Sequence, residues 1–182
     1  SSIEHMGIIA LALGIFSPLS VFGALLHMIN HSLTKSMLFL TSGNILQKYQ
    51  TKQISGVRGL LRLLPVSGPV FLLGLFAIAG IPPFSVFSSE FTILVSIFSA
   101  KNAWLGTGII LLLAIIFAGF AVTMLKMFYG QNQDEQLKTG ETNIPGTIVI
   151  MLLFGLITVT GLLIPGGLNE LINQAQNIIT GA

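Results

Sequence analysis

The stretch HMINHSLTK, residues 27–35, carries two imidazoles and one ammonium at intervals of four residues inside a run that is otherwise apolar. Residues four apart in a helix lie close to one face, and each step rises about 6 Å along the axis. His27, His31 and Lys35 therefore form one stripe about 12 Å long. A lysine at the centre of a membrane-spanning helix costs about 2.5–3.5 kcal/mol, so such residues usually face a bundle interior or a wet cavity.

This stripe suits reversible proton transfer. Histidine exchanges protons near physiological pH, and a lysine that faces a wet interior can pass a proton to water and regain it. Two other interpretations remain open. The stripe can be a packed polar cluster that only fixes helix contacts, or His27 and His31 can hold Zn²⁺, although the sequence offers no cysteine and no clear third ligand nearby. We predict a proton path and no metal site.

A second polar group in an apolar run is Glu90, in GIPPFSVFSSEFTIL, residues 80–94. The segment Gly80–Pro83 should break the helix, because proline lacks a backbone N–H and glycine loosens the chain. Broken helices at ion sites expose freed backbone groups and leave room for water. We predict that Glu90 is a buried titratable carboxyl on the same path. The alternative is a position at the membrane interface.

Three further ionisable residues are candidates for the path. Glu4 and His5 are adjacent, so they lie about 100° apart on a helix and cannot share one face. An interfacial polar pair at the start of a helix explains them equally well. Lys126 lies in the last turn of a predicted helix, where an interfacial anchor is the alternative to a role in the path.

The composition excludes several classes of protein. The 182 residues are 53% hydrophobic and 8% charged, whereas a soluble domain carries about 25% charged residues. We therefore predict an integral membrane protein. The absence of cysteine excludes disulfides and thiolate metal sites, and the net charge of +2 is too small to indicate nucleic-acid binding. No haem or iron–sulfur ligand set, phosphate loop or catalytic triad is present, so we expect neither a cofactor nor a catalytic centre in this chain.

The fold that positions these residues is predicted to be an all-α, polytopic transmembrane bundle forming a single membrane domain over residues 1–182. A span needs about 20 apolar residues, and about five segments qualify. They cover residues 3–16, 19–46, 66–100, 103–128 and 145–164. We interpret 66–100 as one span of two half-helices broken at Gly80–Pro83, and a pair of short spans remains the alternative. Residues 168–182 form an amphipathic tail too polar to span.

The charges predict an orientation. Most basic residues fall on one side of the membrane under this topology, and Lys101 alone falls on the other. The first group is Lys48, Lys52, Arg58, Arg62, Lys126 and Lys138. By the positive-inside rule, the basic loop 47–65 is cytoplasmic and the C-terminus lies outside.

The motifs together resemble a known family. The stripe with the following KSMLFLTSGNI, and the broken segment GIPPFSVFSSEFTIL, are similar to the proton-conducting antiporter-like subunits of respiratory complex I, membrane-bound hydrogenases and multisubunit sodium/proton antiporters. SSIEHMGI most resembles the F group of hydrogenase-4, or formate hydrogenlyase, subunits. The resemblance extends over about residues 1–130. It implies that His27, His31 and Lys35 connect two half-channels and that Glu90 is the terminal group of the second.

The family also uses a glutamate and a lysine on earlier helices, so we expect this chain to be the C-terminal fragment of a longer subunit. The resemblance implies proton translocation in the cell inner membrane, coupled to redox reactions in partner membrane subunits of a hydrogenase or NADH:quinone oxidoreductase complex. The alternatives are a sodium/proton antiporter subunit without a redox partner and a membrane scaffold that transports nothing.

Overall fold

The computed structural model describes the backbone of residues 1–129, 138–141 and 143–181, and the side chains of Lys126 and Tyr129 lie outside the description. Every regular element in these ranges is helical, which confirms the prediction of an all-α fold. The elements are α1 (Ser2–Ile15), α2 (Pro18–Tyr49), the 3₁₀ turn η1 (Ile54–Gly56), α3 (Leu60–Leu63), α4 (Ser67–Ile78), α5 (Ser85–Ser99), α6 (Ala103–Tyr129), α7 (Ile144–Leu162) and α8 (Gly166–Thr180).

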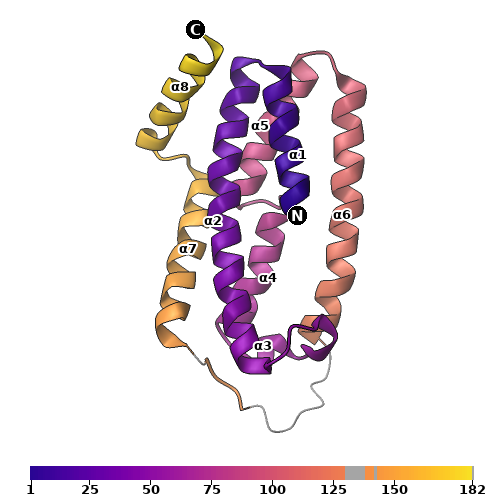
Figure 1. The fold of residues 1–182 in the computed structure, drawn as a ribbon, viewed down its shortest axis with the longest axis vertical. Coiled ribbons are helices and arrows are strands. Elements are labelled where there is room, and N and C mark those ends of the chain that lie inside the picture. The colour runs from indigo at the N-terminus through magenta and orange to yellow at the C-terminus, as the bar shows by residue number, and fades with distance from the viewer. Residues whose placement is uncertain (130–137, 142, 182) are drawn as a thin grey trace.

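The connection between α1 and α2 is a tight turn. Phe16 adopts the left-handed conformation that ends α1. Ser17 caps α2: its hydroxyl accepts from Ser20 N at 3.1 Å, and its own N–H donates to Ser20 Oγ at 2.9 Å. Pro18 occupies the first helical turn, where its missing N–H costs nothing. The two helices therefore run antiparallel and in contact (Figure 1).

Helix α2 is the centre of the bundle and contacts α1, α4, α5, α7 and α8. Three apolar clusters include residues of α2, and two of them lie on either side of its middle. Towards one end lie Ile8, Ile9, Ala12, Ala24, Ile93, Ile97 and Ile109. Towards the other lie Met37, Leu38, Val70, Ala77, Ile78, Phe84, Ile150 and Ile157. The level between these two clusters, near the middle of α2, holds a group of buried polar residues that includes His5, His27 and Glu90.

The break predicted at Gly80–Pro83 is present. Helix α4 ends at Ile78 and α5 begins at Ser85, and the two lie end to end along α2 (Figure 1). Gly80 has the left-handed φ of +67° that glycine adopts without strain. Glycine also lets α7 approach the break, because a Cβ atom at Gly161 would overlap the backbone of Pro83–Ser85. Among the described residues, Ala103–Leu125 and Ile144–Leu162 are the two helical segments long and apolar enough to span a membrane by themselves.

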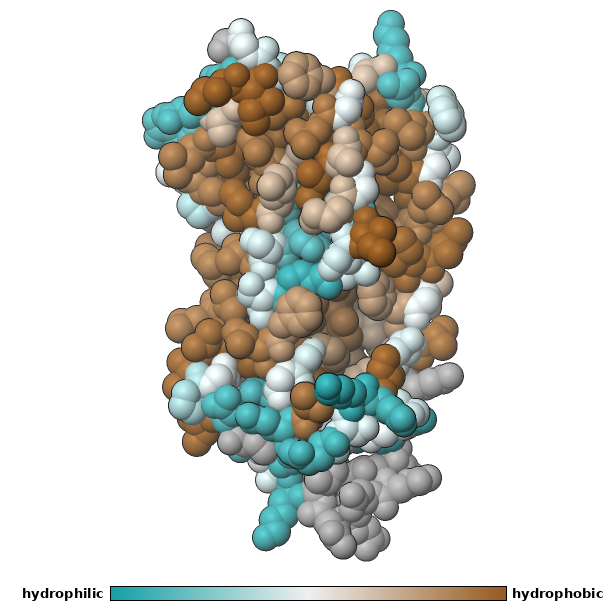
Figure 2. All heavy atoms as spheres, viewed as in Figure 1, coloured by the Kyte–Doolittle hydropathy of each residue, from teal (hydrophilic) through white to brown (hydrophobic). Residues whose placement is uncertain are grey.

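The surface is that of a membrane protein. Large apolar side chains are widely exposed, with Phe39 71%, Trp104 80% and Leu111 61% accessible. Figure 2 shows that they cover most of this face, whereas hydrophilic residues gather at the end formed by η1 and α3 and in a small patch where α1 begins. In water so much exposed apolar surface would be unfavourable, but in a bilayer it faces lipid tails.

The ends of the bundle are more ordered than the sequence predicts. Helix α2 continues to Tyr49, past the predicted end at residue 46, and the stretch 47–65 includes η1 and α3, with Leu60 and Leu64 fully buried. The predicted amphipathic tail forms α8. This helix packs along α2 with Ile172 and Gln176 buried.

Candidate functional site

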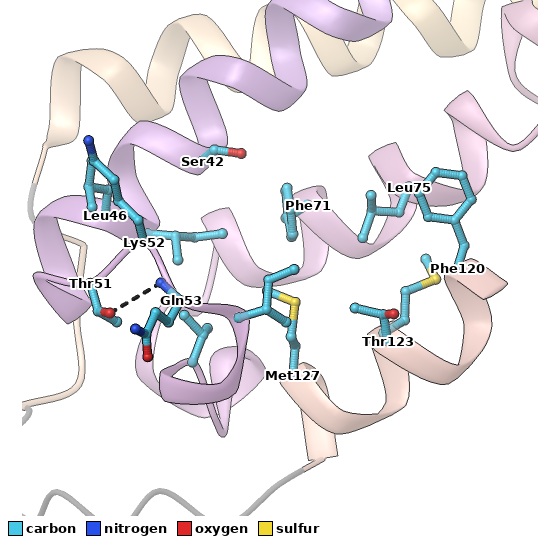
Figure 3. Close-up of a pocket in the computed structure, with 14 residues that line it drawn as sticks. Ser42, Leu46, Thr51, Lys52, Gln53, Phe71, Leu75, Phe120, Thr123 and Met127 are labelled. Carbon is cyan, nitrogen blue, oxygen red and sulfur yellow. Dashed lines mark hydrogen bonds between the residues drawn. The ribbon is translucent and has the colours of Figure 1, made fainter. Parts of the chain in front are cut away.

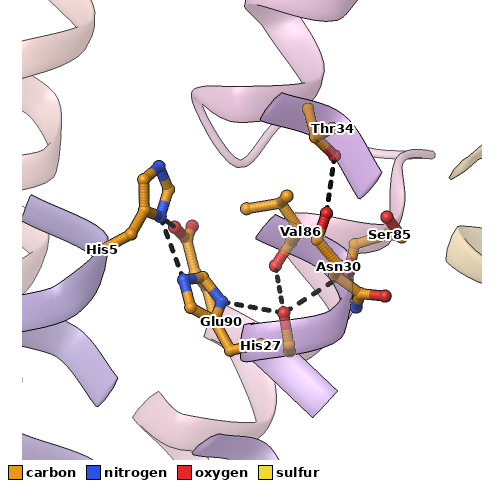
Figure 4. A network of polar contacts seen from close by, with 8 residues as sticks. His5, His27, Asn30, Thr34, Ser85, Val86 and Glu90 are labelled. Carbon is orange, nitrogen blue, oxygen red and sulfur yellow. Dashed lines mark hydrogen bonds and ion pairs between the residues drawn. The ribbon is translucent and has the colours of Figure 1, made fainter. Parts of the chain in front are cut away.

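Buried polar side chains from three helices meet at the level of the α4–α5 break (Figure 4). His5 comes from α1, His27 from α2, and Ser89 and Glu90 from the first turns of α5. His5 and His27 are fully buried, and Glu90 is 6% exposed. A glutamate and two histidines thus lie between two apolar clusters, in the interior of a chain whose outer surface is apolar. We call His5, His27, Ser89 and Glu90 the central cluster.

Hydrogen bonds arrange the central cluster in a line. His5 Nδ1 lies 3.0 Å from His27 Nε2 and 3.5 Å from Glu90 Oε1. His27 Nδ1 lies 2.9 Å from Ser89 Oγ, which donates to Val86 O at 2.9 Å. Since the serine proton points to this carbonyl, neutral His27 donates from Nδ1 and accepts at Nε2, and His5 donates from Nδ1. The single N–H of His5 therefore has two acceptors, His27 and Glu90.

Asn30 anchors the break beside the cluster. Its side-chain amide Nδ2 donates to Ser85 O at 2.6 Å, and its backbone carbonyl accepts from Thr34 Oγ1 at 2.8 Å. Asn30 thus ties the middle of α2 to the first residue of α5. Sequence reasoning missed this role, because an asparagine between two histidines of the stripe has no spacing that singles it out.

The site is rich in unpaired polar atoms. In the described part of the chain, the buried side-chain N and O atoms without a hydrogen-bond partner all lie in or beside the central cluster. They are His5 Nε2, Asn30 Oδ1, His31 Nδ1, Ser85 Oγ and Glu90 Oε1. Buried polar groups normally find a partner in protein or water. Water at the break would supply the missing partners, and the sequence predicts room for water there.

The four residues of the predicted path do not all meet. His31 is 7% exposed, and its ring centroid lies 4.4 Å from that of His5 and 6.3 Å from that of His27. Lys35 lies farther along α2 and is half-buried, with Nζ 5.5 Å from the centroid of the Phe39 ring. It lines a cavity of about 190 Å³ together with apolar residues of α2, α4 and α6. His27, His31 and Glu90 therefore each lie next to His5, whereas Lys35 lies farther along α2.

The weaker candidates have different outcomes. His5 belongs to the central cluster, so the interpretation of this residue as half of an interfacial pair is wrong. Glu4 is half-buried on the neighbouring side of α1, as the 100° step requires. The side chain of Lys126 lies outside the described residues. The histidine pair that the sequence offers for a metal is His27 and His31. The structure instead brings the ligand atoms of His5, His27 and Glu90 within 4.8 Å of one another, a group that does not include His31.

The role of His5 had a signal in the sequence. Ser17-Pro18 predicts the end of one helix and the start of the next, and a turn this short makes the two helices antiparallel neighbours. Residues about equally far from the turn then lie at one level. His5 precedes the turn by about as many residues as His27 follows it.

A second polar cluster fixes the end of the bundle near α3. Glu141 Oε1 accepts from Val66 N and Ser67 N, both at 2.9 Å, and Glu141 Oε2 accepts from Ser67 Oγ at 2.6 Å. Asn44 Nδ2 donates to Ser67 Oγ at 3.0 Å. Partial burial acts to raise the pKa of Glu141, but these hydrogen bonds outweigh it and hold the pKa below its ordinary value. An ionised Glu141 therefore caps the positive N-terminus of α4.

A larger cavity of about 470 Å³ lies at the same end, between α2, η1, α4 and α6 (Figure 3). Its walls are mostly apolar side chains. They include Leu46, Phe71, Leu75, Phe120 and Met127. Lys52 is the ionisable residue among its lining residues, and Gln53 N donates to Thr51 Oγ1 at 3.2 Å on its rim. The residues that line this cavity do not form a series of neighbouring groups that could pass a proton from one to the next. The central cluster is therefore the candidate site.

Comparisons with known proteins agree with the resemblance noted in the sequence. Residues 1–116 match the sequence model of the family described as NADH:quinone oxidoreductase/Mrp antiporter, transmembrane. The hydrogenase-4 component F homolog of Methylacidiphilum infernorum is 37% identical over 154 residues, which are 85% of this chain and 32% of that protein. The NADH-quinone oxidoreductase subunit M of Rickettsia prowazekii is 31% identical over 128 residues, which are 70% of this chain and 25% of that protein.

Solved structures show the same fold. A chain of respiratory complex I from Thermus thermophilus matches with a TM-score of 0.80 and 24% identity, over 97% of this chain and 37% of that one. A chain of the Mrp complex from Dietzia sp. matches with a TM-score of 0.76 and 19% identity, over 97% of this chain and 41% of that one. The chain spans about a third of the length of the proteins it matches.

Proposed function

Because the chain belongs to the NADH:quinone oxidoreductase/Mrp antiporter transmembrane family, we propose that it forms part of a membrane subunit that carries protons through its interior. The observation that carries the proposal is a line of buried groups. His5, His27 and Ser89 are joined by hydrogen bonds, and Glu90 Oε1 lies 3.5 Å from His5 Nδ1 at one end of the line. Such a line is costly in the interior of a membrane protein, and ionisable residues there mark ion and proton pathways.

The contacts support a specific exchange. When Glu90 is ionised, it attracts the Nδ1–H of His5, which lies 3.5 Å away. When Glu90 takes up a proton, that attraction is lost and the same N–H is free to serve His27 at 3.0 Å. His5 can then pass this proton to His27 Nε2 while its unpaired Nε2 accepts another from water. The protonation state of Glu90 thus decides whether the Nδ1–H of His5 is directed at Glu90 or at His27.

Lys35 supplies a charge that the central cluster does not contact. It lies on α2 one turn beyond His31, and its half-buried ammonium borders a cavity. In the proposed mechanism, His31 and water connect Lys35 to His5. A proton that leaves Lys35 removes a positive charge from the interior, and the central cluster responds to that change. The proposed mechanism assigns no step to Glu4 or to Lys126.

We propose five spans, formed by α1, α2, the broken pair α4–α5, α6 and α7. The end-to-end arrangement of α4 and α5 supports one broken span, because each half covers only part of the length of α2 (Figure 1). The basic residues at the η1–α3 end, opposite Lys101, support a cytoplasmic position for residues 47–65. The C-terminal end of α8 lies at the opposite end of the bundle and would be outside.

The partners we propose are other membrane subunits of a redox complex in the inner membrane, of the hydrogenase or NADH:quinone oxidoreductase type. The names of two relatives support this choice, since one is a hydrogenase component and the other an NADH-quinone oxidoreductase subunit. The redox centres and their cofactors would then lie in those partners and not in this chain. The Mrp complex with the same fold supports the alternative, a sodium/proton antiporter subunit without a redox partner.

The test replaces Glu90 in the full-length subunit within its complex. Glu90→Gln keeps the shape of the side chain and removes its titration, so proton uptake by reconstituted vesicles should fall at least tenfold at matched complex content. Glu90→Asp keeps the carboxylate one methylene shorter and should retain part of the activity. Wild-type uptake by an assembled Glu90→Gln complex would show that Glu90 is a packing residue and that the subunit is a scaffold at this site.

A further inference from the structure

We propose that His5, His27 and Glu90 form a binding site for a divalent transition metal ion of the zinc type, and that a bound ion blocks proton transfer through the central cluster. The binding rests on the geometry alone, and the block rests on the proposed function. The sequence predicts no such site, because the three ligands come from three helices and lie up to 85 residues apart along the chain.

The ligand set fits zinc. Two imidazoles and one carboxylate, with a fourth position for water, are a set that holds Zn²⁺ in proteins. Ligands about 2.0–2.1 Å from a tetrahedral ion are separated from one another by about 3.3 Å. His5 Nδ1 lies 3.0 Å from His27 Nε2 and 3.5 Å from Glu90 Oε1, and no pair of the three ligand atoms is more than 4.8 Å apart. Two of the three separations therefore need to change by only a few tenths of an ångström.

The contacts around His5, His27 and Glu90 favour their use as metal ligands. Glu90 Oε1 is buried and has no hydrogen-bond partner among the described residues, so a cation that binds it replaces only the 3.5 Å contact with His5 Nδ1. His27 already carries its proton on Nδ1, which is directed at Ser89 Oγ 2.9 Å away, and so presents the lone pair of Nε2 to the ion. A hydrogen bond to the far nitrogen of a histidine is the usual support of a metal ligand. His5 would carry its proton on Nε2.

The chemistry of the donors selects the class of ion. Mg²⁺ and Ca²⁺ prefer oxygen ligands, so two imidazoles argue against both. Soft ions that require thiolates are excluded because the sequence has no cysteine. A bound Zn²⁺ would occupy the lone pairs of His5 Nδ1, His27 Nε2 and Glu90 Oε1. These are the atoms between which the proposed proton exchange takes place, so transport should stop while the ion is bound.

The experiment uses the full-length subunit in its purified complex, treated with a chelator and then titrated with Co²⁺ or Zn²⁺. Bound Co²⁺ should show the strong visible absorption of a four-coordinate site, and Zn²⁺ should displace it. X-ray absorption at the zinc edge should show two imidazoles in the wild type, a measurement that needs no variant to fold. His5→Gln, His27→Gln and Glu90→Gln should each weaken binding at least tenfold. Glu170 is an exposed residue of α8, so Glu170→Gln is the matched control and should bind the ion as the wild type does.

The outcomes separate the site from the function. Equal affinity in the wild type and His27→Gln, or a zinc shell without imidazole, means an adventitious ion only and overturns the site. Lys35→Ala should lose proton uptake yet keep Co²⁺ affinity, because Lys35 offers no ligand to the cluster. If Zn²⁺ binds with two imidazoles and vesicles still take up protons at the uninhibited rate, the metal site stands, whereas the block and the proton path through these atoms fall.

Discussion

The backbone of Gly80 lies directly against the carboxylate of Glu90: a Cβ atom added at Gly80 would overlap Glu90 Oε2. Gly80 also has a φ of +67°, which L residues with a side chain adopt only with strain. The glycine of the helix break therefore does more than interrupt the helix. It leaves the space in which the carboxylate lies, next to His5.

We expect Gly80→Ala to displace the Glu90 carboxylate. The left-handed conformation costs an alanine about 1–2 kcal/mol, and the overlap forces Glu90 to move as well. Assembly of the complex should fall moderately, and proton uptake per assembled complex should fall as far as in Glu90→Gln. Gly14→Ala in α1 is the matched control, because a Cβ atom there meets nothing within 4 Å. Unchanged proton uptake in Gly80→Ala would show that proton transfer does not depend on the position of the Glu90 carboxylate.

The stripe and the break were predictable because each follows from a few neighbouring residues. Spacing by four places His27, His31 and Lys35 near one face, and glycine with two prolines interrupts a helix in any surroundings. The partners of Glu90 were not predictable in this way. Its contact with His5 depends on how α1 folds back along α2 and on how α5 packs against both, and Asn30 gains its role only from the position of Ser85.

The separation of Lys35 from the histidines has a geometric cause. Each step of four residues turns the side chain by about 40° beyond a full revolution. Across two steps the stripe therefore rotates by about 80°, so that His27 faces the interior among α1 and α5, whereas Lys35 borders a cavity between α2, α4 and α6. Spacing by four alone predicts a single stripe, whereas the accumulated rotation turns its two ends towards different neighbours of α2.

Substitutions of Lys35 should distinguish the effect of its positive charge from the effect of the proton that it can release. Lys35→Ala should strongly reduce proton uptake while the complex still assembles. Lys35→Arg should rescue uptake poorly, because arginine stays protonated and cannot pass a proton on. Lys138→Ala, at an exposed lysine outside the bundle, serves as the control and should pump normally. Full uptake by Lys35→Ala would leave the stripe with a structural role only.

The orientation can be tested with single cysteines, since this segment contains none of its own. Gln50, Asn102 and Asn173 are all exposed. A cysteine at Gln50 should react with a membrane-impermeant reagent from the cytoplasm, and cysteines at Asn102 and Asn173 from outside. Labelling of Gln50 from outside would reverse the orientation. Labelling of Gln50 and Asn102 from the same side would make 66–100 two spans.

The cap on α4 makes stability depend on pH. Hydrogen bonds from Val66, Ser67 and Thr147 hold the pKa of Glu141 below its ordinary value, which is about 4.3. A carboxyl whose pKa is lower in the folded state stabilises that state when it is ionised. Its contribution is therefore complete at pH values above the ordinary pKa, and it is lost as the pH falls through the lower, folded-state pKa.

Glu141→Gln should consequently destabilise the complex near neutral pH and not in acid. The amide still accepts from the backbone of Val66 and Ser67 but removes the negative charge at the N-terminus of α4, a loss of about 0.5–1 kcal/mol. The measurement is the thermal midpoint of the detergent-solubilised complex, from pH 7 down to about pH 3.5, below the ordinary value. The difference between wild type and variant should be largest at pH 7 and shrink as the pH falls below about 4.3. Glu170→Gln should show no difference at any pH. A difference for Glu141→Gln that stays constant with pH would mean that the side chain acts through packing and not through its charge.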